Sequence, residues 1–445
     1  MNKKIKAITS LILVFTLTLG MMGNLSYLAL AATNTWDGTI ADAYDSGNGT
    51  ADSPYIIATG AQLAYMANQV NTIVNCTSGK YFKLVSDINL TNNIWTPIGI
   101  NNSDKWFMGN FNGNGHVINF DNVNYTGDLA GVFGFTSGSC RIYDIGVTGS
   151  LSSSTATYMG GLGARLKGSI YNCYSTATIS STNTTNSNVY VGGLIGFYEG
   201  SSVNEKIRNC YYNGSVSSTS KNAFVGGLAG RLNTGVNSQF LHSYVAGSST
   251  ATGTNGAAGR IIGQLDGTIS SVYWDGVGNV KGAGSGGGSL QLYSDPIKLA
   301  DSLNYLSAPT ETTGFKQWIS NDGSLPIFFV PATDIAGVPT IATAGTDLPL
   351  NGTVSPANAT NKNIVWSIKD VGTTGATIIS DNLVTTATGT VVITATITDG
   401  TKIGITVTST PGTNYTKDFT ITVSEPFFAI TDIVGVPVSA VAGTD

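Results

Sequence analysis

The 445-residue chain is poor in charged side chains, and basic residues are the scarcer kind. Charged residues make up 11% of it, against about 25% in ordinary soluble domains. Its 21 Lys and Arg are outnumbered by 26 Asp and Glu, so the net charge is −5. Binding to phosphate backbones needs a concentrated basic surface. This composition therefore excludes nucleic acid as the expected partner.

Histidine and cysteine are almost missing. The two histidines are His116 and His242, and no H-E-x-x-H or C-x-x-C motif occurs. These are the spacings that zinc sites need, so we predict no metal and no cofactor. A Ser-His-Asp triad would have to use one of these histidines, and nothing in the sequence marks its partners. We therefore expect no catalytic residue.

The N-terminus has the pattern of an export signal. Lys3, Lys4 and Lys6 precede an apolar run over residues 8–19, and Ala29-Leu30-Ala31 supplies a small-x-small cleavage site. We predict a signal peptide over residues 1–31, with an uncleaved membrane anchor as the alternative. Cleavage would leave 18 basic and 26 acidic residues, a net charge of −8. No later apolar run is long enough to cross a bilayer, so we expect an extracellular mature chain without a membrane span.

Glycine is abundant, and a six-residue pattern built on it recurs through the middle of the chain. It reads LAGVFG, MGGLGA, VGGLIG, VGGLAG and AGRIIG, beginning at residues 129, 159, 191, 225 and 258. The steps of 30, 32, 34 and 33 residues indicate stacked supersecondary units. Each unit holds short β-type segments with Gly, Asn and Ser at the corners. A β-propeller would need about 40–45 residues per blade, so we predict a β-solenoid.

A second pattern follows each hexapeptide and defines inward positions. Cys173 and Cys210 occupy the place that Ile145 has in the preceding unit. A position that accepts Ile or Cys is most simply an apolar one, where Cys acts as a small hydrophobe. A disulfide between neighbouring turns is the alternative, because parallel strands lie about 4.8 Å apart. One residue earlier, a polar column is predicted, consisting of Asp144, Asn172, Asn209 and His242.

These motifs resemble a known family. The GGL-hydrophobic-G hexapeptide, followed by NCY at residues 172–174 and 209–211, is similar to the GLUG repeat of bacterial surface and secreted proteins. The match covers residues 129–275, and segments such as WTPIG at 95–99 resemble what precedes such repeats. The resemblance implies a right-handed parallel β-helix. It also implies that the chain is part of an adhesin-like protein, or that it lies beside the catalytic domain of a secreted peptidase.

Helical caps are expected at both ends of the solenoid. Thr59 would cap a short helix that buries Leu63, Ala67 and Val70. Asp295-Pro296 would begin another, with leucines at 299, 303 and 306. Residues 314–330, which include Trp318, are predicted to form a terminal strand or two.

The residue pattern changes near residue 333 to alternating Thr, Val and Ile, as in residues 391–397. This is the pattern of half-buried antiparallel strands, and Trp366 would fill the core of a small sandwich. The segment resembles bacterial immunoglobulin-like (Ig-like) modules, without the disulfide of many such folds. Residues 333–347 return with few changes at 431–445. We therefore expect a second module that is cut short, and a longer parent protein.

The predicted fold is all-β, a right-handed parallel β-helix with small helical caps followed by an Ig-like β-sandwich. The predicted domains are a signal peptide (1–31), an N-terminal cap with the first turns (32–128), the GLUG-repeat β-helix (129–281), a glycine-rich link with a C-terminal cap (282–332), an Ig-like domain (333–426) and the start of a second one (427–445).

One column is a candidate binding surface. The position after each hexapeptide holds Phe135, Arg165, Phe197, Arg231 and Gln264. Stacked aromatic and guanidinium groups can pack on sugar rings or peptide groups and donate hydrogen bonds. The alternative is a packed ladder with only its polar ends in water.

We interpret the chain as a secreted or cell-surface binding, adhesion or display protein rather than an enzyme. Its expected partners are glycans or other components of host or cell-wall surfaces. A polysaccharide hydrolase or lyase is the main alternative. Such enzymes need paired carboxylates, and acids are sparse between residues 129 and 263. A third reading is the targeting region of a longer secreted enzyme.

Overall fold

The computed structural model contains two compact units, Met1–Asp295 with Ser302–Phe315, and Pro296–Asp301 with Lys316–Asp445. The predicted signal peptide, part of the glycine-rich link and the second module lie outside the described residues. The structure describes residues 35–91, 95–184, 187–200, 205–234, 239–266, 269, 272–274, 283–286, 291–292, 299, 303, 316, 318–321, 324–397 and 415–424.

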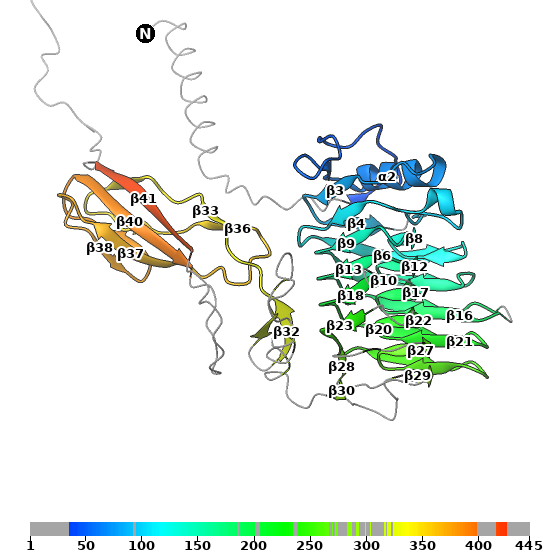
Figure 1. The fold of residues 1–445 in the computed structure, drawn as a ribbon. Helices are drawn as coiled ribbons and strands as arrows, with labels where there is room; N and C mark the ends of the chain where they lie inside the picture. The colour runs from blue at the N-terminus through cyan, green and yellow to red at the C-terminus, as the bar shows by residue number, and fades with distance from the viewer. Residues whose placement is uncertain are drawn as a thin grey trace, which may run out of the picture. The chain divides into compact units, whose positions relative to one another are not determined.

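The first unit is a parallel β-helix, which confirms the predicted solenoid. Its strands line up from turn to turn in four parallel sheets, and Figure 1 shows the turns stacked below the helix α2. The twelve-strand sheet consists of β1 (Thr35–Trp36), β4 (Ile88–Thr91), β6 (Val117–Tyr125), β10 (Gly146–Ser153), β14 (Tyr174–Ser175), β19 (Tyr211–Tyr212), β24 (Ser243–Val245), β28 (Val272–Trp274) and β30 (Gln291–Leu292), with β15 (Thr178–Ser181), β20 (Ser215–Ser218) and β25 (Ser248–Ala251) beside them.

The other three sheets complete each turn. The seven-strand sheet consists of β2 (Tyr55–Ile57), β3 (Tyr81–Leu84), β5 (Asn110–Asn112), β9 (Arg141–Tyr143), β13 (Ser169–Tyr171), β18 (Lys206–Arg208) and β23 (Gln239–Leu241). The five-strand sheet consists of β7 (Leu129–Ala130), β11 (Tyr158–Gly160), β16 (Val189–Gly192), β21 (Ala223–Gly226) and β26 (Ala257–Gly259). The six-strand sheet consists of β8 (Phe133–Phe135), β12 (Gly163–Leu166), β17 (Ile195–Gly200), β22 (Ala229–Thr234), β27 (Ile262–Asp266) and β29 (Ala283–Gly286).

The hexapeptides form the corner between the five-strand and six-strand sheets. Val191 pairs with Val225 and Gly192 with Gly226, as the repeat predicts. A Cβ atom built on Gly226 would lie 2.6 Å from the backbone nitrogen of Gly263 in the next turn. The glycines are therefore required because the backbones of neighbouring turns approach too closely for a side chain.

A helix covers the N-terminal end of the solenoid core. The helix α2 (Gly60–Thr72) begins at Thr59, whose side chain forms a reciprocal capping box with Gln62. Leu63, Ala67 and Val70 are buried on its inner face, as predicted. A short 3₁₀ helix, η1 (Ser103–Lys105), lies further along. Of the second predicted helix, the described residues Leu299 and Leu303 are buried, and the rest lies outside the described residues.

The predicted polar column is present. Asp144, Asn172, Asn209 and His242 all have positive φ, between 51° and 58°. Asn, Asp and His tolerate this left-handed conformation better than most residues. The Asn172 amide donates a hydrogen bond of 2.7 Å to Asp144 Oδ1, and the Asn209 amide donates one of 2.6 Å to Asn172 Oδ1. The repeat therefore marks a sharp bend that is held by side chains from successive turns.

The cysteines of neighbouring turns lie in the core. Cys140, Cys173 and Cys210 are buried free thiols, while Cys76 is half-buried. Burial raises the pKa of the Cys140 thiol to about 12 and that of Cys173 well above its usual range. A buried thiol with a raised pKa is a poor nucleophile at neutral pH.

We predict that a thiol reagent at pH 8 labels at most one cysteine of the native protein, Cys76, and all four after unfolding. Ellman titration of protein purified without reductant measures both numbers. A total of two thiols after unfolding would show that one disulfide is present, because a disulfide removes two reactive groups, and peptide mapping would then test whether it joins Cys173 and Cys210.

The second unit is a separate β-module with its own core. A hairpin of β31 (Trp318–Asn321) and β32 (Ser324–Phe328) confirms the strands predicted over residues 314–330. The remaining strands form three small sheets. The first pairs β33 (Asp334–Ala336) with β36 (Thr353–Ser355), and the second consists of β34 (Ile341–Thr343), β41 (Tyr415–Ser424), β40 (Gly389–Ile397) and β37 (Val365–Asp370). The third consists of β35 (Leu348–Pro349), β39 (Asn382–Val384) and β38 (Thr377–Ile379).

Alternation in β40 and β41 buries the residues that the sequence marked as inward. Val391, Ile393 and Ala395 are fully buried, and Trp366 on β37 packs into the same core. The sheets are largely antiparallel, with β34 added parallel to β41. The assignment to the Ig-like class stays a prediction.

Candidate functional site

The residues after each hexapeptide form one column across the six-strand sheet, which we call the ladder. Arg165 pairs in register with Phe135 on one side and with Phe197 on the other. Phe197 in turn pairs with Arg231, and Arg231 with Gln264. The structure therefore brings all four candidate binding residues together, in the order that the repeat predicts.

The ladder is held by cation–π contacts. The Arg165 guanidinium lies 5.4 Å from the Phe135 ring centre and 5.3 Å from that of Phe197. The Arg231 guanidinium lies 4.9 Å from the Phe197 ring. Contacts within about 6 Å are attractive, because the ring face carries partial negative charge. The arginines therefore act as spacers between aromatic rings.

The rings of the ladder are covered, and its arginines are accessible. Phe135 and Phe197 are only 3% and 5% exposed, whereas the Arg165 and Arg231 side chains are 28% and 27% exposed. The prediction that all four residues form a surface ladder is therefore wrong for Phe135 and Phe197, which are buried. Their faces are occupied by guanidinium groups and by rings from other strands, so a ligand would meet the arginines first.

A second aromatic column runs beside the ladder, on the five-strand sheet, and we call it the aromatic column. It consists of Tyr158, Tyr190 and Phe224, which stack at 5.7 Å and 5.5 Å between ring centres. Tyr190 lies 5.7 Å from Phe197, and its hydroxyl accepts a hydrogen bond of 3.3 Å from Arg231. These residues stand just before the second, third and fourth hexapeptides, a position that the sequence reasoning did not use.

Acidic side chains pair with the exposed cations. Arg165 Nη2 lies 2.9 Å from Glu199 Oε2, and Lys167 Nζ lies 3.5 Å from the same oxygen. Arg231 Nε lies 2.8 Å from Asp266 Oδ2. Partial burial tends to raise the pKa of Glu199, but the hydrogen bond and the charges of Arg165 and Lys167 outweigh it and hold that pKa below its usual range. Glu199 is therefore ionised at neutral pH.

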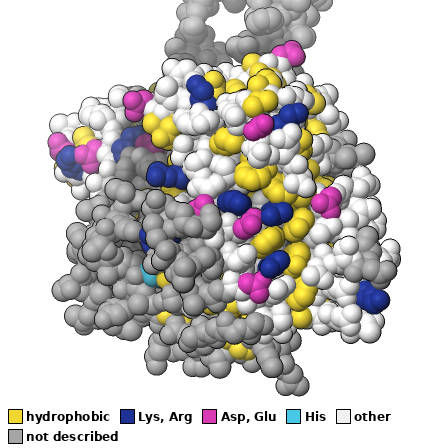
Figure 2. Space-filling view, turned by 45° about the vertical axis from the view of Figure 1, so that its right-hand side comes forward, with side chains coloured by type: hydrophobic (Ala, Val, Ile, Leu, Met, Phe, Trp, Pro, Cys, Tyr) yellow, Lys and Arg dark blue, Asp and Glu magenta, His cyan; other side chains and the backbone are white. Residues whose placement is uncertain are grey.

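Figure 2 shows hydrophobic side chains running down one face of the solenoid with Lys, Arg, Asp and Glu among them. Such a face combines apolar area with hydrogen-bonding groups of both kinds. It differs from the largely uncharged Ser, Thr and Asn residues that point outward on the twelve-strand sheet, such as Ser150, Thr178 and Ser215.

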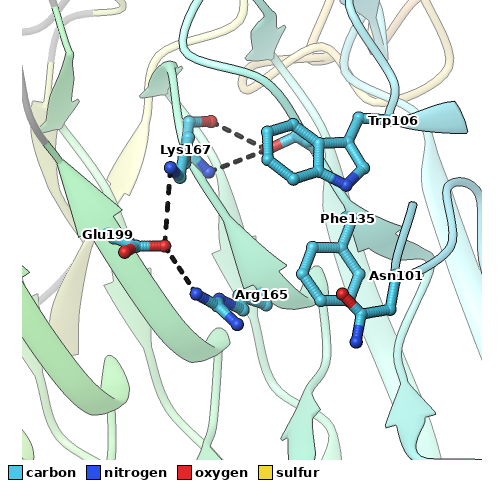
Figure 3. Close-up of a pocket in the computed structure, with 7 residues that line it drawn as sticks. Asn101, Trp106, Phe135, Arg165, Lys167 and Glu199 are labelled. Carbon is cyan, nitrogen blue, oxygen red and sulfur yellow. Dashed lines mark hydrogen bonds and ion pairs between the residues drawn. The ribbon is translucent and has the colours of Figure 1, made fainter. Parts of the chain in front are cut away.

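A pocket of about 140 Å³ lies at the N-terminal end of the ladder. Its lining residues are Asn101, Trp106, Phe135, Thr136, Arg165, Lys167 and Glu199. Figure 3 shows the polar trio of Lys167, Glu199 and Arg165 on one side and Trp106 with Phe135 on the other. The Trp106 and Phe135 rings stack at 6.0 Å with an interplanar angle of 11°. Lys167 Nζ lies 5.4 Å from the Trp106 ring.

The other titratable residues that the sequence marked have structural surroundings. His116 Nδ1 lies 3.1 Å from Asp87 Oδ1, where the neighbouring strands β6 and β4 begin. His242 belongs to the polar column described above. Within the described residues, no group of three His, Cys, Asp or Glu side chains is placed to hold a metal ion. In the same part of the chain, no helix is long and apolar enough to cross a membrane.

No family model matches the chain. Two relatives have similar segments. A protein of Evansella cellulosilytica named "Putative Gly-rich membrane protein" is 33% identical over 116 residues, which are 24% of this chain and 12% of that protein. Halomucin of Haloquadratum walsbyi is 32% identical over 175 residues, which are 36% of this chain and 2% of that protein. The chain thus spans only a small part of either relative.

Among solved structures, one titled as a "putative immunoglobulin A1 protease" from Bacteroides ovatus is similar. It is 21% identical, with a TM-score of 0.44, over 64% of this chain and 95% of that one.

Proposed function

We propose that this chain is a secreted or cell-surface binding protein without enzymatic activity, and that the ladder and the aromatic column form its adhesive face. The expected partners are glycans of a cell wall or host surface. The solenoid would present this face, and the module over residues 333–426 would act as a spacer. Membership in the GLUG-repeat group is part of this proposal.

One observation carries the proposal, namely that accessible cations and partly exposed aromatic residues lie side by side on one face. Arg165, Arg231 and Lys167 are each about a quarter exposed, and Tyr158 and Phe224 beside them are partly exposed. The exposed parts of Tyr158 and Phe224 offer apolar contact area to sugar rings, and guanidinium groups donate several hydrogen bonds to hydroxyl or acidic oxygens. The segmental similarity to proteins named as a membrane protein and a mucin supports a surface location.

The test replaces both Arg165 and Arg231 with alanine. Because hot-spot truncations cost about 2 kcal/mol or more, we expect retention on immobilised cell-wall and host polysaccharides to fall at least about tenfold. The thermal midpoint should fall only modestly, since partly exposed ion pairs contribute about 0–1 kcal/mol each and exposed cation–π contacts about 0.5–1 kcal/mol each. Affinity electrophoresis on a polysaccharide panel, with calorimetry for stability, measures both.

Lys369→Ala is the matched control, because Lys369 pairs with Asp418 within the second unit, which contributes no residue to the ladder. Unchanged retention of the double variant would contradict the proposed face. Release of reducing sugar from any polysaccharide of the panel by the native chain would contradict the non-enzymatic assignment.

A further inference from the structure

We propose that the pocket at the N-terminal end of the ladder binds a carboxylate-bearing sugar, such as a uronic acid unit of an acidic polysaccharide. The inference rests on the proposed function, since it names the ligand class of one part of the same face. It starts from the imbalance of charges and hydrogen-bond donors around Arg165 and Lys167.

Two cations share one carboxylate oxygen at this pocket. Both Arg165 and Lys167 reach Oε2 of Glu199, at 2.9 Å and 3.5 Å. Glu199 is the only acidic residue among those that line the pocket. One positive charge is therefore uncompensated there, in a chain whose net charge is −5. Opposite charges within about 4–6 Å stabilise each other, so a ligand anion would complete the pairing.

Two N–H groups of the residues that line the pocket also lack a hydrogen-bond acceptor. Among the described residues, Arg165 Nε and Trp106 Nε1 are buried and make no hydrogen bond. Both groups can only donate, and a buried donor without an acceptor is unfavourable. Carboxylate oxygens accept several hydrogen bonds, and arginine matches them with two parallel donors.

The dimensions and the aromatic wall favour one sugar unit over a longer segment. The pocket volume of about 140 Å³ is well below the roughly 300–1,000 Å³ of pockets that enclose a drug-sized ligand. That is room for a carboxylate and the adjoining edge of a ring. Trp106 and Phe135 form the apolar wall opposite the cations, as Figure 3 shows. The rest of a polysaccharide chain would continue along the ladder toward Arg231.

The test compares a galacturonic acid tetramer with its fully methyl-esterified form, which removes the charge and keeps the sugar ring. We expect isothermal titration to give the acid at least about tenfold higher affinity than the ester, with a preference that shrinks as salt is added. Lys167→Gln should abolish the preference, and Lys167→Arg should restore it. Glu199→Gln should tighten binding of the acid severalfold, because the competing internal carboxylate is gone. Asp121→Asn, an exposed carboxylate on the twelve-strand sheet, is the control and should change nothing.

Equal affinities for the acid and the ester would overturn the inference, and so would weaker binding of the acid by Glu199→Gln. Tighter binding of a hexaglutamate peptide than of the acidic tetramer would also overturn it, in favour of an acidic protein partner. If acid and ester bind equally and the Arg165→Ala/Arg231→Ala variant still loses both, the adhesive face stands and only the anion pocket fails. If no saccharide of the panel is retained by the native chain, both proposals fail.

Discussion

Replacing Gly226 with alanine is expected to destabilise the solenoid by about 3 kcal/mol, the upper end of the usual cost of overpacking. The new methyl group would collide with the carbonyl oxygen of Ala229 and would lie 2.6 Å from the backbone nitrogen of Gly263. These are backbone atoms of the same turn and the next one, so no side-chain rotation can relieve the overlap. Neighbouring turns would have to separate, and inter-turn hydrogen bonds such as that from Gly227 N to Arg260 O at 3.0 Å would weaken.

Urea unfolding followed by circular dichroism measures this effect, and Gly127→Ala is its control. A Cβ atom on Gly127 would meet nothing within 4 Å, so that variant should unfold at the same urea concentration as the native protein. Equal stability of Gly226→Ala and the native protein would mean that the turns are not stacked as closely as described.

Acid should destabilise the solenoid, with His242 responsible for a separable part of the loss. Burial and then the nearby Arg208 charge lower the pKa of His242 to about 4, from an ordinary value of 6.5. Below pH 6.5 the unfolded chain takes up a proton that the folded chain accepts only near pH 4. The stabilisation is therefore complete above about pH 6.5 and is lost as the pH falls toward 4. Because His242 is partly exposed, we expect about 1–2 kcal/mol after allowance for screening.

His242→Asn isolates this contribution. Asparagine occupies the equivalent position in the two preceding turns, at Asn172 and Asn209, with the same left-handed backbone. The variant should match the native protein in urea at pH 8 and exceed it at pH 4.5. Parallel loss of stability in both proteins between these pH values would instead assign the acid sensitivity to carboxylates with lowered pKa values, such as Asp87.

The solenoid could be predicted from the sequence alone, because the repeat period determines which residues of neighbouring turns pair in register. Residues at equivalent positions of the repeat, such as Val191 and Val225, become direct neighbours once the turns stack. The same logic placed Cys173 beside Cys210 in the core and aligned Asn172 with Asn209. Columns of residues that run along the solenoid axis can thus be predicted from the amino-acid sequence.

Contacts across the columns could not be derived in this way. Phe135 is covered by Trp106 and Phe197 by the tyrosines of the five-strand sheet, and the repeat period specifies neither contact. The partner of Arg165 is Glu199, which stands two places beyond the ladder position in the next turn. Trp106 belongs to the N-terminal turns, which lie outside the repeat. It reaches the pocket because these turns stack next to the first repeat unit, where its ring packs on Phe135. The pocket therefore combines residues whose spacing carries no signal.

The near-identical cross-section of successive turns has an evolutionary consequence. Each turn contacts mainly the turns directly before and after it, so duplicating a unit of about 33 residues would insert a new layer without disturbing the rest. Each insertion would lengthen the molecule by about 4.8 Å and add one more rung to the arginine–aromatic column. Reach and avidity for a polymeric ligand could then change by gene duplication alone, while the pocket beside Trp106, a residue outside the repeat, would not be copied.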